Sequence, residues 1–207
     1  MLDVLGRTTS INVRKVLWTC AEIGIDIKHV EWGLDGLPLT SPEFLALNPN
    51  ALVPVVIDDG FMLRESNTIC RYLAAKHRRL DLLPEAAAAR ARVEQWMDWQ
   101  ATELNNAYRY AFLALVRRST QHADAAAVEA SARSWNEHMA TLDAELQDGR
   151  PFVTGADFTL ADIVLGLSTH RWVSTPIERP ALPAVARYYD ALRSRPAFQA
   201  VTHPHPP

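Results

Sequence analysis

The chain has 207 residues, which is enough for one or two domains with a substantial core. A hydrophobic fraction of 48% and a charged fraction of 22% are ordinary for a globular protein in water. The net charge of −3 argues against nucleic-acid and anionic-membrane partners, and no apolar run is long enough to span a bilayer. The first five residues lack the charged start and long apolar core of a signal peptide, so we expect a cytoplasmic protein.

The cysteines and histidines predict neither a disulfide nor a metal site. Cys20 and Cys70 both fall among apolar residues on expected helical faces, which is typical of reduced core thiols in a cytoplasmic protein. The seven histidines show no metal-ligand spacing. We therefore expect no metal cofactor.

The start of the chain predicts a β-α-β unit. Residues 1–5 are a strand candidate, and residues 6–10 are rich in turn and capping residues. Apolar side chains then recur at helical spacing until Gly24, and an alternating pattern follows over residues 25–32. Strand, helix and strand within about thirty residues are the parts of a β-α-β unit.

A short helix, a hairpin and a further helix follow. Ser41-Pro42 is a typical helix start. Residues 53–57 are β-branched apart from Pro54, which predicts a strand, and Asp59-Gly60 signals a tight hairpin with a returning strand. Ser66 is a good N-cap for the helix that comes next. The predicted order of the first 78 residues is β-α-β-α-β-β-α.

The composition changes after a linker at residues 79–84, and the rest of the chain predicts helices. Long strand-poor segments there carry apolar stripes at helical spacing. Phe158 to Ile163 is a strong helix start, with Thr159 as the cap, Asp162 at the third helical position and a hydrophobic staple between its ends. An extended tail is expected from Pro196. The expected helices lie at residues 85–118, at 124–146, from 159 onward and at 184–193.

Two motifs give the chain its resemblance to a known family. Leu52-Val53-Pro54-Val55, with Glu65-Ser66 eleven residues after the proline, resembles the glutathione-binding core of the cytosolic glutathione S-transferases. The segment from Gly155 to Asp162 resembles the capping box in the core helix of the same family. The resemblance runs from Met1 to about Phe198. It implies a thioredoxin-like α/β domain over residues 1–78, an all-helical domain over residues 85–207, and a homodimer.

The resemblance also implies how glutathione binds. The bond before Pro54 is cis in that family, and the main chain of Val53 pairs with the cysteinyl unit as a short added strand. Glu65 takes the ammonium group, while the Ser66 hydroxyl and the helix start take the γ-glutamyl carboxylate. Leu52 and Asn50 flank this segment, with Asn50 as a candidate for the glycyl carboxylate. Without the resemblance, the same stretch is a hairpin and a capped helix with no ligand.

A serine is the candidate catalytic residue. The first seventy residues contain no tyrosine that could be the catalytic residue, and Cys20 lies too deep in the first helix for that role. Ser10-Ile11-Asn12-Val13-Arg14-Lys15 resembles the Ser-Pro-Asn-Val-Arg-Lys pattern of many bacterial members, which places the functional hydroxyl on Ser10 and suggests a serine-type enzyme, either theta- or delta-like or nu-like. Asn12 is a second donor candidate and Thr9 is the competitor to Ser10. Ser10 as a plain N-cap remains the alternative.

The chemical task of this serine is modest. A thiol with a pKa near 8.5 must be shifted by ~1.5 units, or ~2 kcal/mol, to be half ionised at pH 7. A hydroxyl that donates to the sulfur supplies ~1–1.5 kcal/mol, and a helix N-terminus adds ~0.3–1 kcal/mol. Ser10 and the start of the first helix are therefore expected to supply most of the shift.

The second half is expected to form the pocket for a small hydrophobic electrophile. Tyr108, Arg109 and Phe112 are spaced to share neighbouring helix faces. The expected activity is a glutathione transferase with glutathione as co-substrate. Two alternatives stay open, a glutathione-dependent disulfide or peroxide reductase and a non-catalytic glutathione- or ligand-binding protein. A dithiol mechanism is excluded because Ser10 to Val13 occupies the place of a Cys-x-x-Cys motif.

Overall fold

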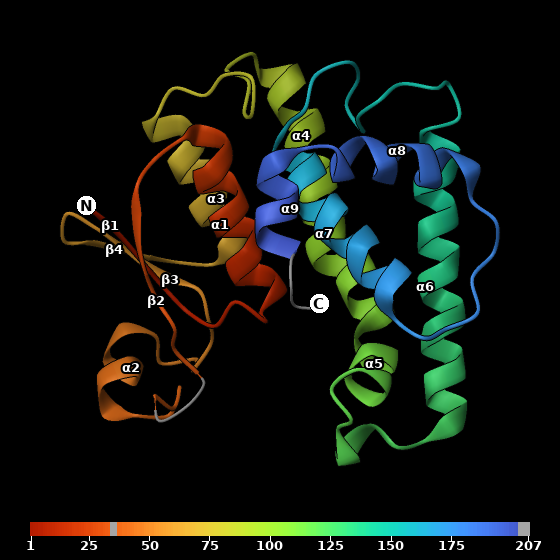
Figure 1. Cartoon of the computed structure of the whole chain (residues 1–207), viewed down its shortest axis with the longest axis horizontal. Coiled ribbons are helices and arrows are strands. Elements are labelled where there is room, and N and C mark those ends of the chain that lie inside the picture. The colour runs from red at the N-terminus through yellow and green to blue at the C-terminus, as the bar shows by residue number, and fades with distance from the viewer. Residues whose placement is uncertain (34–36, 203–207) are drawn as a thin grey trace. The chain divides into compact units, whose positions relative to one another are not determined.

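The computed structural model describes residues 1–33 and 37–202, and it divides into two compact units (Figure 1). Unit 1 comprises Met1–Glu85 together with the chain from Arg195 onward, and unit 2 comprises Ala86–Ser194. The sequence predicted a second domain over residues 85–207. The difference arises because the segment that begins at Arg195 packs on the first helix of unit 1.

Unit 1 contains the predicted order of elements. Its strands form one sheet in the order β2-β1-β3-β4, in which β1 and β2 are parallel and the other neighbours are antiparallel. The predicted α/β fold is therefore confirmed. The elements are β1 (Leu2–Leu5), α1 (Ile11–Ile23), β2 (Ile27–Val30), α2 (Pro42–Leu47), β3 (Val55–Asp58), β4 (Phe61–Arg64) and α3 (Ser66–Lys76).

Helices α1 and α3 lie side by side against the sheet (Figure 1). Helix α1 is buried on most of its surface, including the charged residues Arg14 and Lys15. On another part of the sheet edge, Phe44 of α2 joins an apolar cluster with Leu5, Val53 and Val55. Packed side chains thus fix the end of the central strands at which Leu5 and Val55 pair.

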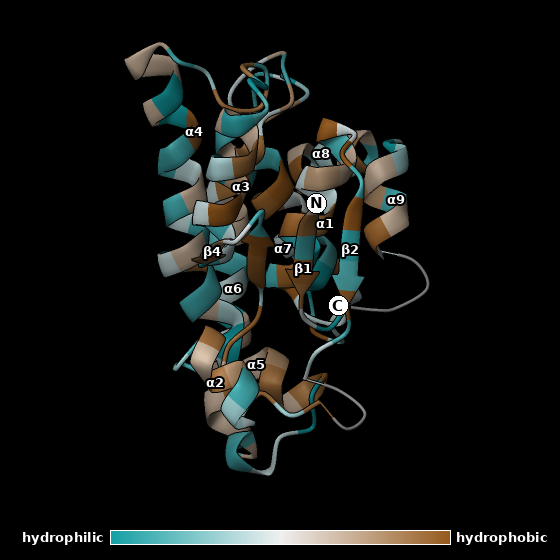
Figure 2. Ribbon diagram, turned by 90° about the vertical axis from the view of Figure 1, so that its left-hand side faces the viewer, coloured by the Kyte–Doolittle hydropathy of each residue, from teal (hydrophilic) through white to brown (hydrophobic). Residues whose placement is uncertain are grey.

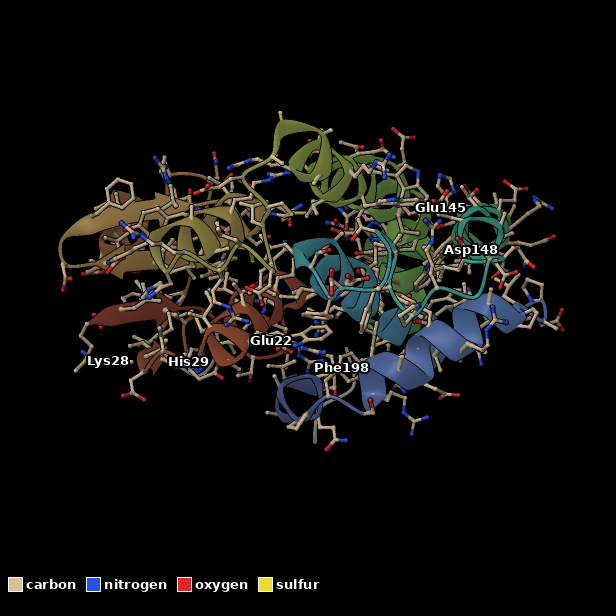
Figure 3. The ribbon with its side chains drawn as sticks, turned by 90° about the horizontal axis from the view of Figure 1, so that it is seen from above. Glu22, Lys28, His29, Glu145, Asp148 and Phe198 are labelled. Atoms are coloured by element: carbon tan, nitrogen blue, oxygen red, sulfur yellow. The ribbon has the colours of Figure 1, made fainter. Side chains whose placement is uncertain are left out.

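The prediction of an extended tail from Pro196 is wrong. Residues Pro196–Thr202 form helix α9, which packs on α1. The rings of Trp18 and Phe198 lie 4.9 Å apart, and Arg195 donates to both carboxylate oxygens of Glu22 at 2.9 and 2.7 Å. Figure 3 labels Glu22 and Phe198 at this junction. The helix forms because the fully buried Trp18 needs an apolar cover on the side of α1 that faces away from the sheet.

Unit 2 is all helical, as predicted. The single helix expected over residues 85–118 is continuous but changes to π geometry for five residues in its middle. In Figure 2, hydrophilic bands recur along α4, whereas nearly every residue of α7 from Leu160 to Trp172 is buried. The elements are α4 (Ala87–Trp99), the π-helix η1 (Gln100–Leu104), α5 (Asn105–Leu115), the 3-10 helix η2 (Thr120–His122), α6 (Ala125–Glu145), α7 (Leu160–Ser174) and α8 (Pro183–Arg193).

The predicted capping box at the start of α7 is present. The buried carboxylate of Asp162 accepts hydrogen bonds from the main-chain N–H groups of Val153 and Thr159 at 2.9 and 2.8 Å. It also accepts from the hydroxyls of Thr159 and Tyr188, both at 3.1 Å. Burial nevertheless raises the pKa of Asp162 to about 6, because the loss of solvation outweighs these bonds.

This pKa predicts a pH dependence of stability. In the unfolded chain Asp162 ionises near pH 3.9, whereas in the folded chain it keeps its proton until about pH 6. The folded state therefore binds more protons in this window, and stability falls as the pH rises through it. We expect the advantage of wild type over Asp162→Asn in free energy of unfolding to shrink by about 2–3 kcal/mol between pH 4 and pH 7.

Urea unfolding of both proteins across this pH range measures the difference, and Asp157→Asn serves as a matched control at an exposed aspartate of the same segment. An advantage that grew with pH would contradict the prediction, because it would mean that the ionised carboxylate is the form that the fold prefers.

Candidate functional site

Three segments of unit 1 meet at one edge of the sheet. The register pairs Leu5 of β1 with Val55 of β3, and Val55 with Arg64 of β4. The loop after Leu5, the segment before Val55 and the turn after Arg64 therefore leave the sheet from adjacent positions. These segments carry Ser10, Val53-Pro54 and Glu65-Ser66, so the sheet brings together the residues that the sequence motifs singled out.

Gly6 is the point of closest approach between two of these segments. Its φ of 145° lies in a region that favours glycine. A Cβ atom there would lie 2.6 Å from the Val13 side chain and 2.8 Å from the Val53 Cβ. No other residue type fits, and the loop that leads to Ser10 consequently runs against Val53.

Ser10 stands at the N-cap position of α1 without capping it. Its backbone has the extended conformation of an N-cap, with φ −88° and ψ 123°, but its side chain makes no cap hydrogen bond. The half-buried hydroxyl makes no hydrogen bond to any other described residue. It is therefore available to a ligand at the start of the helix. Thr9 is half-buried beside it, and Asn12 is exposed in the first turn.

Hydrogen bonds to the β2 side of the sheet hold the loop that carries Ser10. The N–H of Gly6 donates to the Val30 carbonyl at 2.9 Å. The Thr8 hydroxyl donates to the Glu31 carboxylate at 2.8 Å, and the Thr8 N–H donates to the same carboxylate at 3.2 Å. From the other side, Arg14 Nε donates to the Thr8 carbonyl at 2.6 Å. Sequence reasoning missed Glu31 because it lies 23 positions from Thr8, and it assigned no role to Arg14 although Arg14 belongs to the motif that begins at Ser10.

The Val53–Pro54 bond is cis, as the resemblance implied. Val53 lies outside the ladder, and its main-chain groups make no hydrogen bond with any other described residue. The main-chain N–H and C=O of Val53 are therefore both available to pair with an added strand. Leu52 is 60% exposed beside them.

Asn48 shapes this segment and was missed by the sequence analysis. It is only 2% exposed, and its Nδ2 donates to the Leu52 carbonyl at 2.7 Å. Its Oδ1 accepts from the N–H of Asn50 at 3.1 Å. An asparagine that bonds its own chain two residues on is a typical turn signal. Asn50 is exposed, and its main-chain donor is already used within the turn.

The turn after β4 corrects one detail of the sequence analysis. Helix α3 begins at Ser66, so Glu65 occupies the N-cap position and the prediction of Ser66 as cap is wrong. Glu65 has a positive φ of 68°, which directs the chain sharply into the helix, and its side chain is exposed. Ser66 is largely buried in the first turn, where main-chain N–H groups lack helical partners.

The two cysteines take no part in this site. Both are free and buried. Burial raises the pKa of Cys20 to about 12 and that of Cys70 to about 11. A thiol with such a pKa is not ionised at neutral pH and is a poor nucleophile. The expectation of core thiols agrees with this burial.

In unit 2, two of the three predicted pocket residues lie together. The rings of Tyr108 and Phe112 are buried and 6.3 Å apart, whereas Arg109 is exposed on α5. A residue that the sequence analysis missed, Arg171 of α7, stacks on Phe112 with its guanidinium carbon 3.9 Å from the ring centroid. Its signal in the sequence is an arginine in a helix that is almost entirely buried.

No group of three or more His, Cys, Asp or Glu side chains among the described residues is placed to hold a metal ion. No helix in the described ranges combines the length and hydrophobicity that a bilayer crossing requires.

The fold and the site define a thioredoxin-like unit, with a cis-proline and a helix N-terminus at the same edge of its sheet, joined to a helical unit. The family model described as "Glutathione S-transferase, N-terminal domain" matches residues 5–81. The model described as "Glutathione S-transferase, C-terminal domain" matches residues 125–191.

Relatives and solved structures agree with these family models. The chain is 36% identical to the glutathione S-transferase GstB of Escherichia coli, over 97% of both chains, and 34% identical to glutathione S-transferase 3 of Zea mays, over 100% of this chain and 97% of the relative. A theta class glutathione S-transferase from Xanthomonas axonopodis pv. citri, solved with glutathione bound, superposes with a TM-score of 0.92 at 37% identity, covering 100% of this chain and 99% of that one. The chain therefore belongs to the glutathione S-transferase family and is an enzyme of that class.

The hydrogen bonds of Thr8 predict a positioning role. Thr8→Val keeps the shape of the side chain and the main-chain bond to Glu31 but removes the hydroxyl bond, so the loop before Ser10 should lose precision without unfolding. We expect the specificity constant for glutathione to fall about fivefold, as for the loss of about 1 kcal/mol. Steady-state kinetics measure this effect. Thr102→Val, at an exposed threonine of unit 2, is the control, and unchanged kinetics in Thr8→Val would show that the loop holds its position without this bond.

Proposed function

We propose that unit 1 binds glutathione and activates its thiol through Ser10. The observation that supports this most directly is the uncapped Ser10 hydroxyl at the N-terminus of α1, in line with Val53 and Glu65-Ser66 along one sheet edge. The Xanthomonas structure that resembles this chain over its whole length contains glutathione. The proposal makes the chain a serine-type member of its family.

Each part of glutathione has a partner in this proposal. The Val53 main chain pairs with the cysteinyl unit, next to cis-Pro54 and the exposed Leu52. Glu65 takes the ammonium, and Ser66 with the first turn of α3 takes the γ-glutamyl carboxylate. Asn50 is the candidate for the glycyl carboxylate through its side chain.

Activation of the thiol is electrostatic. The Ser10 hydroxyl donates to the sulfur, and the N-terminus of α1 adds the field of its dipole, so the thiolate is favoured over the thiol. Asn12 in the first turn is the candidate for a further donor, and Thr9 is the alternative to Ser10 one residue earlier. The thiolate then attacks an electrophilic carbon, forming a C–S bond while a leaving group departs or a double bond takes up the electron pair.

Unit 2 supplies the electrophile pocket in this proposal. Tyr108 and Phe112 offer aromatic surface, and Arg109 stands at the solvent side of the same helix. The proposed electrophile is small and hydrophobic in its main part. A homodimer in the cytoplasm, typical of the family, completes the proposal.

The Ser10 hydroxyl is tested by Ser10→Ala and Thr9→Ala. We expect Ser10→Ala to raise the pKa of the bound glutathione thiol by about one unit, because a charge-assisted hydrogen bond of ~1.5 kcal/mol is lost. Thiolate absorbance in the ultraviolet against pH measures the pKa in both variants and in wild type. Loss of the shift in Thr9→Ala alone would transfer the role to Thr9, and an unshifted thiol in wild type would favour a binding protein without thiolate activation.

Glu65 should affect affinity and leave the thiol unchanged. Glu65→Gln removes the charge that pairs with the ammonium, and we expect the Kd for glutathione to rise about tenfold or more. Calorimetric titration gives the Kd, and the thiol pKa of the bound form should equal that of wild type. Glu129→Gln, at an exposed glutamate of α6, is the matched control. Equal affinity in Glu65→Gln and wild type would remove Glu65 from the site.

A further inference from the structure

Unit 2 contains a buried cation that its own residues do not neutralise. Arg171, in the last turns of α7, is only 5% exposed. Among the residues that the structure describes, no Asp or Glu forms an ion pair with it. By contrast, Arg195 in unit 1 is paired through two hydrogen bonds with Glu22. An arginine stays protonated at any physiological pH, so the charge of Arg171 is buried together with its side chain.

Aromatic rings and one hydroxyl are the partners of Arg171. Its guanidinium carbon lies 3.9 Å from the centroid of Phe112 and 5.3 Å from that of Tyr108. Nη1 donates to the Tyr108 hydroxyl at 3.2 Å, and that hydroxyl in turn donates to Asn105 at 2.5 Å. Cation–π contacts and a neutral acceptor offset part of the cost of burial but leave the charge itself unbalanced.

The unused edge of the guanidinium has the geometry that binds a carboxylate. Nε is buried and has no hydrogen-bond partner, and Nη2 makes no hydrogen bond to another described residue. These two nitrogens form the side of the guanidinium that can donate two parallel bonds to one anionic group. Because Phe112 and the Tyr108 hydroxyl fix the plane of the group, this edge is oriented before any ligand arrives.

A second positive charge approaches the same ring. The guanidinium carbon of Arg117 lies 5.4 Å from the centroid of Phe112. Arg117 is exposed whereas Arg171 is buried, so the same ring contacts one guanidinium at the surface and one in the interior.

We propose that Arg171 binds an anionic group, a carboxylate in the simplest case, on the electrophilic substrate. The apolar part of such a substrate would lie against Phe112 and Tyr108. The inference rests on the proposed function in one respect, that Tyr108 and Phe112 belong to the electrophile pocket. It narrows the substrate class from hydrophobic electrophiles in general to aromatic or short aliphatic electrophiles that carry one negative charge.

The kinetic test compares 4-chloro-3-nitrobenzoate with its methyl ester. In both compounds the glutathione thiolate forms a C–S bond at the ring carbon and chloride leaves with the electron pair of the C–Cl bond. After division by the uncatalysed rates, we expect wild type to prefer the carboxylate about tenfold or more in kcat/KM. Arg171→Met, which keeps much of the apolar volume, should abolish this preference with unchanged KM for glutathione. Arg133→Met, at an exposed arginine of α6, should behave as wild type.

A binding experiment separates this inference from the proposed thiol chemistry. Benzoate and benzamide are titrated into the full chain without glutathione, with tryptophan fluorescence as the signal, because the Trp135 ring lies 4.8 Å from Tyr108. We expect benzoate to bind at least tenfold more tightly than benzamide in wild type and equally weakly in Arg171→Met. This result stands even if Ser10 proves not to activate the thiol.

Arg171→Lys decides the question if the methionine variant does not fold. Lysine keeps the charge but lacks the two-nitrogen edge, so the preference for benzoate should fall several-fold and not vanish. Equal binding of benzoate and benzamide to wild type would overturn the proposal. Full retention of the preference in a folded Arg171→Met or Arg171→Lys variant would also overturn it and leave Arg171 with a structural role only.

Discussion

The close approach of Gly6 to Val53 is the constraint on which the candidate site depends. The loop between β1 and α1 can reach Ser10 at the start of α1 only by passing where a Cβ atom would meet Val13 and Val53. Glycine is therefore required at the end of β1, and the chain must take a φ of 145° there. The same contact fixes the distance between the loop that ends in Ser10 and the segment that ends in the cis-proline. The separation of the hydroxyl from the Val53 main chain is thus determined by packing and not by either segment alone.

The polar groups of unit 1 fall into those that are presented at this edge of the sheet and those that hold the presenting segments in place. At the edge, the Ser10 hydroxyl and the Val53 main chain make no hydrogen bond to another described residue. Elsewhere in the unit, the buried Asn48 and the surface pair of Thr8 and Glu31 use their groups to hold the segments that present the others. Hydrogen-bond donors that have no partner within the protein and are held at a fixed edge suit an anionic ligand. The protein then needs little reorganisation when the ligand binds. The buried thiols of Cys20 and Cys70 cannot compete as nucleophiles, so the reactive sulfur has to come from the substrate.

The sequence predicted those features that depend on neighbours along the chain. The β-branched run around Pro54, the Asp59-Gly60 turn and the Thr159-Asp162 capping box are local patterns with local causes, and each is present in the structure. What it missed depends on residues far apart. Thr8 meets Glu31 across 23 positions, and Arg195 meets Glu22 across 173, so neither contact has a periodicity or spacing that reveals it. Helix α9 was missed for the same reason, since its seven residues form a helix because Trp18 of α1 lies beneath Phe198.

Two buried charged residues of unit 2, Asp162 and Arg171, differ in how many of their hydrogen-bonding groups have partners within the protein. This difference distinguishes a residue that serves folding from one that serves function. Asp162 accepts four hydrogen bonds from three residues, which is close to the capacity of a carboxylate, and each of these partners belongs to the same unit. Arg171 has five N–H donors and uses one of them, on a neutral hydroxyl. A methionine or leucine at this position would fill the same space with a more favourable free energy of folding, because an unbalanced buried cation costs several kcal/mol in general. The retained charge and the unused edge of its guanidinium therefore point to a partner from outside the chain, and the electrostatics of the site require that partner to be an anion.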